Sequence, residues 1–472
     1  MNGVKRLTEF YKNNKSRNFT VSEISEACSD FFAASAGVLF CLLPVSVFAY
    51  LQAANSWKLL TTFPVFTGVF NGFAVLSGVI AAAMYFFNSR KTSLKNVLSD
   101  NIPSLIFLAL CLWMLISTAA NGFTENALKG GEYRNESLFT FFIYFLVYFF
   151  CSSLIKKERL KKAPVYALLA CSWVAGIASL VHRFIKPLVS MEEIDSGRIS
   201  FVFHQFNHYG YFLTIAITLS AALFVLGKGV KQKIFTALTF CFNSALLTVN
   251  ATFGCFLAVC AALVFLAGVA AVTEKRFNAV WLAPFILFLI ISYATGRFFN
   301  SFFTDLAGLF NDIKMIIGNN TGGSSGPALI GGDSAESVRT AGDAGTGRWS
   351  LWTSTVGYIK ERPLFGHGIE GIGRRLEEET GYSDRPHNEF LQYAVFFGIP
   401  AAVIYVSGVM SVFVKAFCRR AKLDSTSSAC LVAAFAYLVS SFFGNTMYYT
   451  APLFFIFLGI GSSVPSESKN RL

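Results

Sequence analysis

Long apolar runs separated by short polar connectors dominate the chain. A helix needs about 20 apolar residues to cross a hydrocarbon core roughly 30 Å thick. Runs near this length lie at residues 31–53, 62–88, 102–120, 137–155, 164–185, 207–227, 234–250, 252–272, 279–296, 390–414, 426–444 and 450–464. The pattern predicts an all-α polytopic membrane protein with about 12 transmembrane helices.

Composition and charge agree with a membrane protein and favour one orientation. Only 14% of the 472 residues are charged, against about 25% in an ordinary soluble domain. Lys and Arg gather in alternate connectors, at 12–17, 89–95, 156–162, 228–233, 274–276 and 415–422. Such connectors stay on the cytoplasmic side during insertion, so we expect both termini to be cytoplasmic. The net charge of +12 then faces membrane lipids, and no nucleic-acid partner is needed to explain it.

The same pattern divides the chain into segments. We assign residues 1–30 to a cytoplasmic N-terminal segment, 31–296 to a bundle of about nine spans, 390–464 to the last three spans and 465–472 to a cytoplasmic tail. The connector 297–389 is the one large hydrophilic segment, and we expect it to form an extracytoplasmic subdomain. Its part 317–347 is rich in Gly, Ser and Ala and is predicted to be flexible, because it has too few large apolar residues for a core. Its part 348–389 is predicted to be helical.

The distribution of several other charges does not indicate a functional site. The first four spans have no charge at their centres, which weakens a transporter hypothesis, because ionisable residues in spans mark ion or proton paths. The connector 121–136, which ends at Glu136, mixes charges of both signs and is expected to be solvated. Glu377 to Glu379 are expected to form a solvated helix face. We predict no metal site and no cofactor.

Arg348 and His387 are the candidate functional residues of the hydrophilic connector. From Arg348 onward, the spacing of Trp349, Trp352, Val356 and Ile359 predicts a helix with one apolar face. Arg348 falls in the first turn of this helix, where free N–H groups and the helix dipole favour an anion.

Two further positions adjoin spans on the same side. His387 precedes a helix that Asn388 can cap, and a lone interfacial histidine without function is the alternative. Arg198 follows a Ser-Gly turn and precedes the span near Asn207. A lipid-headgroup anchor is as good an interpretation of Arg198 as a functional role. Asn207 is interpreted as a helix cap.

Three segments in chain order resemble the O-antigen ligase and polymerase family of integral-membrane glycosyltransferases. They are RISFVFHQFNHYGYF (198–212), GRWSLWTSTVGYIKERPLFGHGIEGIG (347–373) and HNEFLQYAVFFGIP (387–400). The second and third are closer to the family signature than the first, and the resemblance extends from about the fifth to the eleventh span. The chain differs at NATFG (250–254), where many members have a serine-arginine-glycine, so that arginine is missing here.

The resemblance implies a helical bundle of the C-type glycosyltransferase kind. It implies that Arg198 and Arg348 bind a donor diphosphate and that His387 activates an acceptor hydroxyl. We add Asn388, Asn207 and Arg385 as supporting residues. The implied reaction moves a glycan from a polyprenyl (undecaprenyl) diphosphate to a glycan, lipid or protein acceptor. It takes place at the outer face of the cytoplasmic membrane, without metal and with inversion.

Three alternatives stay open. A polymerase of lipid-linked repeat units for a surface polysaccharide would use the same residues as a ligase. A flippase or transporter of lipid-linked glycans would favour charged spans or inverted repeats. A membrane scaffold whose outer loop binds a partner would tolerate the loss of His387.

Overall fold

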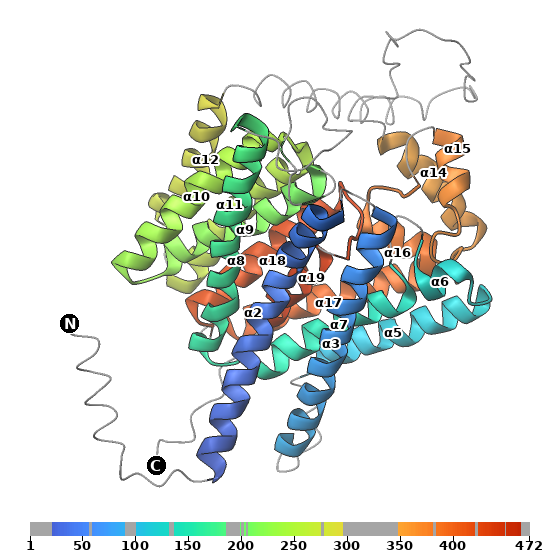
Figure 1. The fold of residues 1–472 in the computed structure, drawn as a ribbon, viewed down its shortest axis with the longest axis horizontal. Coiled ribbons are helices and arrows are strands. Elements are labelled where there is room, and N and C mark those ends of the chain that lie inside the picture. Colours follow the sequence, from blue (N-terminus) through green and yellow to red (C-terminus); the bar gives the residue numbers. More distant parts are fainter. Residues whose placement is uncertain are drawn as a thin grey trace.

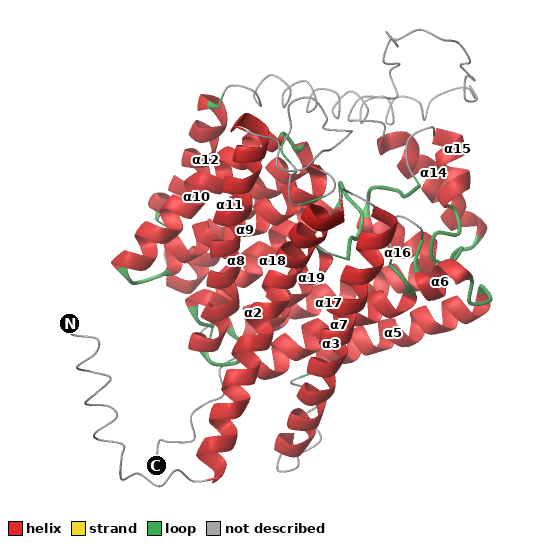
Figure 2. Cartoon of the chain, viewed as in Figure 1, coloured by secondary structure: helices red, strands yellow, loops and turns green. Residues whose placement is uncertain are grey.

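A computed structural model describes most of the membrane-embedded chain. The described residues are 21–55, 59–89, 101–131, 136–185, 199, 203, 206–274, 278–295, 348–380, 384–420, 423–448 and 450–463. Within them every regular element is a helix (Figure 2), as predicted. The first 20 residues of the predicted N-terminal segment 1–30, the predicted tail 465–472 and the predicted flexible part 317–347 lie outside the described residues.

Each predicted apolar run contains at least one helix. Seven helices are long and apolar enough to cross a membrane, and four shorter apolar segments, Leu138–Leu154, Ala279–Ala294, Ser425–Ser441 and Ala451–Ser462, accompany them. The chain is therefore a multi-pass helical protein, while the count of about 12 crossings stays a prediction. The helices of the bundle are α2 (Val21–Asn55), α3 (Leu59–Ser89), α5 (Ile102–Ala120), α7 (Leu138–Leu154), α8 (Glu158–Leu180) continued by η1 (Val181–Ile185), α9 (Phe206–Leu226), α10 (Val230–Asn250), α11 (Phe253–Glu274), η2 (Ala279–Leu282), α12 (Ala283–Ala294), α17 (Ile399–Cys418), α18 (Ser425–Ser441) and α19 (Ala451–Ser462).

The outer helices present apolar stripes to their surroundings. On α17 the exposed side chains of Val403, Met410, Val414 and Phe417 recur at three- to seven-residue intervals and form one face. A soluble protein rarely exposes contiguous apolar faces of this kind, whereas a helix packed against lipid does. The exposed leucines of α5 form a similar stripe, at Leu105, Leu108, Leu112 and Leu115.

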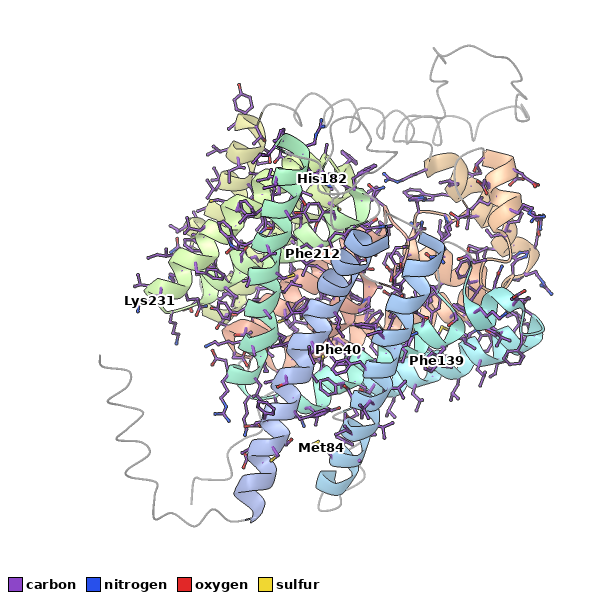
Figure 3. The ribbon with its side chains drawn as sticks, in the orientation of Figure 1. Phe40, Met84, Phe139, His182, Phe212 and Lys231 are labelled. Atoms are coloured by element: carbon purple, nitrogen blue, oxygen red, sulfur yellow. The ribbon has the colours of Figure 1, made fainter. Side chains whose placement is uncertain are left out.

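Helices α9 and α19 form the centre of the bundle. Every residue of α19 is buried, and so are most residues of α9. Phe212 of α9 lies inside the bundle, whereas Lys231 lies at its edge (Figure 3). A helix that is apolar on all sides is suited to such a position. Helix α18 packs against both of them, and the joint between α18 and α19 therefore lies next to the core.

The predicted span 390–414 is wrong in its first part. The structure has two helices there, α16 (Glu389–Phe397) and α17, and Gly398 separates them with φ of 88°. An added Cβ at Gly398 would lie 1.8 Å from the Leu364 carbonyl oxygen. The left-handed backbone and this close approach both require glycine. Pro400 then occupies the first turn of α17, where proline is favoured.

A small helical group stands at one end of the bundle. It contains α14 (Arg348–Glu361) and α15 (Gly373–Thr380), and it lies at the opposite end from the start of α2 and the end of α3 (Figure 1). Helix α14 packs against α15 and α16, and the short α6 (Glu125–Lys129) contacts α7.

The predicted apolar face of α14 is wrong at one position. Val356 is 40% exposed, whereas Leu351 and Thr355 are fully buried. The buried face is therefore rotated from the predicted one toward Leu351 and Thr355. Trp352 and Ile359 belong to both faces and pack against the core.

Candidate active site

The segment 363–368 is joined to the end of α16 by backbone hydrogen bonds. The amides of His367 and Gly368 donate to the carbonyls of Val395 and Phe396 at 2.8 and 2.9 Å. The Ile399 amide in turn donates to the Pro363 carbonyl at 2.8 Å. These bonds satisfy carbonyls that the end of a short helix leaves free. The turn Pro363–Gly366 and the break between α16 and α17 at Gly398 are therefore in direct contact.

The end of α5 fixes the same turn from the bundle side. Ser117 Oγ donates to the Phe365 carbonyl at 2.7 Å, and the Trp113 indole donates to the Phe397 carbonyl at 3.0 Å. The Trp113 and Phe365 rings are stacked with centroids 5.8 Å apart. The segment that leads toward His387 is therefore anchored to a membrane helix.

Arg385 lies at the centre of a buried ion-pair cluster. Its Nη1 atom donates to Glu136 Oε2 at 2.6 Å and to the Thr446 carbonyl at 3.1 Å. Its Nε atom donates to Glu370 Oε1 at 2.8 Å, and Nη2 bonds to the same oxygen. Burial alone would lower the pKa of Arg385, but the Glu370 and Glu136 carboxylates raise it by more, so the guanidinium keeps its charge. Arg385 is thus occupied by carboxylates and is not available to a diphosphate.

The prediction that Glu136 belongs to a solvated connector is wrong. Its side chain has no exposed surface. Besides the bond from Arg385, Glu136 accepts hydrogen bonds from the Tyr144 hydroxyl and from Thr446 Oγ1. A carboxylate tolerates such burial only when it is paired and hydrogen-bonded. In contrast, Glu125 and Lys129 of the same connector are exposed, as expected.

His387 follows Arg385 by two residues and has an unusual backbone. Its φ is 47°, in the left-handed region, and Glu370 on the other side of Arg385 has φ of 56°. Non-glycine residues in this region cost of order 1–3 kcal/mol, and they cluster at functional sites. Asn388 then caps α16 by accepting a hydrogen bond from the Leu391 amide at 3.0 Å. The histidine turn is held by Arg385 before it and by this cap after it.

Glu389 is a second buried carboxyl, and it has no ion-pair partner in the described part of the chain. It accepts hydrogen bonds from the hydroxyls of Tyr405 and Tyr437 at 2.6 and 3.2 Å. Burial raises the pKa of Glu389 to about 7, although the two tyrosine hydrogen bonds act in the lowering direction. A nearby carboxylate, Glu136, adds to the rise. Glu389 therefore anchors α16 to α17 and α18 through tyrosine hydroxyls.

Arg348, at the start of α14, is in a different environment. It has no carboxylate partner among the described residues, and its buried Nε atom has no hydrogen-bond partner there. Its guanidinium carbon lies 5.9 Å from the centroid of the Phe443 ring, and the Trp352 ring lies 6.3 Å from the same ring. The guanidinium thus rests on an aromatic face with donors left over.

The joint between α18 and α19, residues 442–446, connects Arg348 with the histidine turn. Arg348 contacts the joint at Phe443, while Arg385 bonds to it at Thr446. Gln392 of α16 adds two bonds to Thr446, through the Thr446 hydroxyl at 2.6 Å and the Thr446 amide at 3.2 Å. Two segments that are distant in sequence therefore meet on one short connection.

The third predicted site residue, Arg198, lies outside the described residues. Its neighbour Ile199 is described, and Asn250 Nδ2 donates to the carbonyls of Ile199 and Phe206, both at 2.8 Å. Asn250 Oδ1 accepts from the Thr252 hydroxyl at 2.6 Å. Asn207 lies inside α9, which begins at Phe206, so the interpretation that Asn207 caps this helix is wrong.

Sequence reasoning missed three polar residues of this region. Asn250 stands in the NATFG segment where the family resemblance implies an arginine, and it fixes both ends of the 199–206 segment. Glu136 and Glu389 were assigned to the ends of the hydrophilic connectors 121–136 and 297–389. Among the described residues no group of three or more His, Cys, Asp or Glu side chains is arranged to hold a metal ion.

Comparison with known proteins supports the resemblance. A search of curated proteins finds no match to this chain. The family model Wzy_C, described as O-antigen ligase, matches residues 238–406. The matched range contains Arg348, Arg385 and His387, whereas Arg198, Asn207 and the joint 442–446 lie outside it. This match shows that residues 238–406 are similar to an O-antigen ligase domain, and it supports the resemblance to the O-antigen ligase and polymerase family.

Proposed function

We propose that this protein is a membrane glycosyltransferase that moves a glycan from a polyprenyl (undecaprenyl) diphosphate to an acceptor hydroxyl. The family match supports a transferase of the O-antigen ligase and polymerase type. The observation that carries the finer proposal is the guanidinium of Arg348, which has no carboxylate partner among the described residues and lies on the same joint to which the His387 turn is bonded.

Arg348 is the proposed ligand of the donor diphosphate, together with Arg198. A guanidinium presents a planar fork of donors that matches phosphate oxygens. Each hydrogen bond of this charged type contributes roughly 1.5–3 kcal/mol. Because charge builds on the diphosphate as it leaves, the arginines stabilise the transition state more than the ground state. This role requires no metal ion.

His387 is the proposed general base. The acceptor hydroxyl attacks the anomeric carbon of the donor sugar, and its proton passes to the imidazole of His387. The bond between the anomeric carbon and the phosphate oxygen breaks, and the diphosphate leaves with the electron pair. Positioned proton transfer of this kind contributes typically 10²–10⁴-fold in rate. A single displacement predicts inversion at the anomeric carbon.

The proposed site faces the outside of the cytoplasmic membrane. Basic connectors favour the cytoplasm for the opposite end of the bundle, and α14 and α15 stand at the far end from the start of α2 (Figure 1). Nucleotide sugars are cytosolic, so a transferase on the outer face needs a lipid-linked donor. The acceptor is a lipid, protein or glycan in a ligase, and a second lipid-linked repeat unit in a polymerase.

The test is glycan transfer by the purified protein in nanodiscs. Undecaprenyl-diphosphate-linked glycan and membrane acceptors are extracted from the source cells, and the release of undecaprenyl diphosphate is measured. We expect release by the wild type with EDTA present, and at least a hundredfold slower release by His387→Ala. Arg198→Ala is expected to slow it as well.

Two results would contradict the proposal. Undiminished release by the His387→Ala variant would remove the base from the mechanism and favour a scaffold. Movement of intact lipid-linked glycan across the membrane by the wild type, without release of diphosphate, would favour a flippase.

A further inference from the structure

Asn445, in the joint between α18 and α19, has a buried side-chain amide. Its side chain is 4% exposed, and its Oδ1 atom has no hydrogen-bond partner among the described residues. An unsatisfied buried acceptor is costly, and native proteins keep few of them. Such a group in a native protein therefore requires an explanation, and a ligand that donates to it is one.

The neighbours of Asn445 are fixed on both sides. Thr446 bonds through its amide, carbonyl and hydroxyl to Gln392, Arg385 and Glu136. On the other side, an added Cβ at Gly444 would lie 1.5 Å from the Tyr211 hydroxyl oxygen, so the backbone is closely packed there. The joint therefore cannot easily turn to give Asn445 a partner from the protein itself.

Along the chain, Asn445 lies between the two residues at which the joint contacts the proposed site. Arg348 contacts the joint at Phe443, and the turn that carries His387 is bonded to it at Thr446. In the proposed reaction, the sugar that is attached to the diphosphate lies between the diphosphate and the base. Asn445 occupies the corresponding interval of the joint. Sugars offer hydroxyl and acetamido donors, which suit an amide oxygen.

We propose that Asn445 Oδ1 accepts a hydrogen bond from the donor sugar that is directly attached to the diphosphate. Asn445 is then a specificity residue for the glycan part of the donor, whereas Arg348 binds the diphosphate part. The inference rests on the proposed function and adds the substrate group that this residue recognises. Asn445 lies beyond the matched range 238–406, so the family match does not assign it a role.

Asn243 offers a matched control. It is also a buried asparagine, and its Oδ1 atom has no hydrogen-bond partner in the described part of the chain. Its Nδ2 atom, however, donates to Ser172 Oγ at 3.0 Å and to the Thr239 carbonyl at 2.9 Å, within the bundle. The bond to Ser172 joins α10 to α8, which is the usual use of an amide between membrane helices.

The experiment measures lipid binding to the protein in nanodiscs. Two probes are compared: undecaprenyl diphosphate without sugar, and the undecaprenyl-diphosphate-linked glycan extracted from the source cells. For Asn445→Ala we expect the dissociation constant of the glycan-bearing lipid to rise roughly three- to tenfold, the range of one neutral hydrogen bond. Binding of the sugar-free lipid stays unchanged. Asn243→Ala changes neither constant, and thermal unfolding of each variant verifies its folding.

The variants distinguish a failure of the proposed sugar contact from a failure of the proposed function on which it rests. Arg348→Ala is expected to weaken binding of both lipids. If Arg348→Ala does so but Asn445→Ala has no effect, or weakens both lipids equally, the sugar contact is refuted and Asn445 holds only water or structure. If the wild type binds neither lipid, the proposed function itself fails.

Discussion

Two arginines near the histidine turn have opposite environments. Arg385 has no exposed surface, and two carboxylates and a backbone carbonyl occupy its donors. Arg348 contacts an aromatic ring and has no carboxylate partner in the described part of the chain. Both side chains contact the joint 442–446. Their different surroundings are therefore not explained by different distances from the core of the bundle.

These environments distinguish a guanidinium with a structural role, Arg385, from one that is available to a ligand, Arg348. A buried guanidinium with its charge already compensated contributes geometry, because binding a further anion would first require breaking ion pairs. A partly buried guanidinium without an anion keeps its donors for a substrate. The supporting role that the sequence suggested for Arg385 is therefore a positioning role for the His387 turn, and the diphosphate role stays with Arg348.

The largest effect is expected for the stability of Arg385→Ala. Removing the guanidinium leaves the Glu136 carboxylate buried without its cation, which costs about 3–5 kcal/mol in unfolding free energy. Thermal unfolding in detergent should show a clear loss of stability. Glycan transfer should fall in proportion to the folded fraction or below it, because the turn that carries His387 loses its anchor.

A charge-neutral control tests the cause of that loss. Combining Arg385→Gln with Glu136→Gln and Glu370→Gln removes all three charges and should recover part of the stability. If the triple variant is as unstable as Arg385→Ala, packing volume and not the uncompensated carboxylate is responsible.

The second prediction concerns Glu389, a buried carboxyl with no ion-pair partner among the described residues. Its pKa rises by burial from 4.5 to about 7 on folding. Its stabilising effect is therefore complete below about pH 4.5 and is lost as the pH rises toward 7. The loss amounts to about 3 kcal/mol. Glu389→Gln keeps an acceptor for the Tyr405 hydroxyl and should be more stable than the wild type at pH 8.

Unfolding curves of both proteins between about pH 5 and 8 measure this effect. The wild type should lose stability relative to Glu389→Gln as the pH rises, and most of the divergence should occur below pH 7. Parallel curves would mean that Glu389 has a cation partner in the membrane-embedded protein.

The third prediction concerns activity and not stability. Arg348→Ala should slow glycan transfer roughly 10- to 100-fold, which corresponds to the loss of one charged hydrogen bond. Its unfolding temperature should stay close to that of the wild type, because no ion pair in the described structure is broken. Arg348→Lys should recover only part of the rate, since an ammonium lacks the planar fork. A large loss of stability in Arg348→Ala would erase the distinction between the two arginines.

Much of the fold could be predicted because the length of apolar runs is a local property. The all-helical bundle follows from these runs, and each contains a helix in the structure. The break at Gly398 was missed because α16 and α17 together have the length of one span. Its signal was present in the glycine two residues before Pro400, a pattern that ends one helix and starts another.

The site was less predictable because its partners are distant in sequence. Arg348 could be placed at a helix start from local spacing alone. Glu136 could not be placed beside Arg385, since 249 residues separate them and the flanking charges of the connector suggested solvent. The tyrosine partners of Glu389 lie on two other helices, so nothing near Glu389 in the sequence indicates a buried carboxyl.

The smallest effect is expected for Arg375, an exposed arginine of α15. Its side chain is 55% exposed, and its nitrogen lies 3.4 Å from Glu361 Oε2 while the guanidinium covers the Tyr358 ring. Exposed ion pairs contribute little because solvent screens them and both side chains lose conformational freedom. Arg375→Ala should therefore leave both the unfolding temperature and the transfer rate unchanged. A rate loss comparable to that of Arg348→Ala would place Arg375 among the anion ligands, and exposure would then be no guide to which guanidinium the substrate uses.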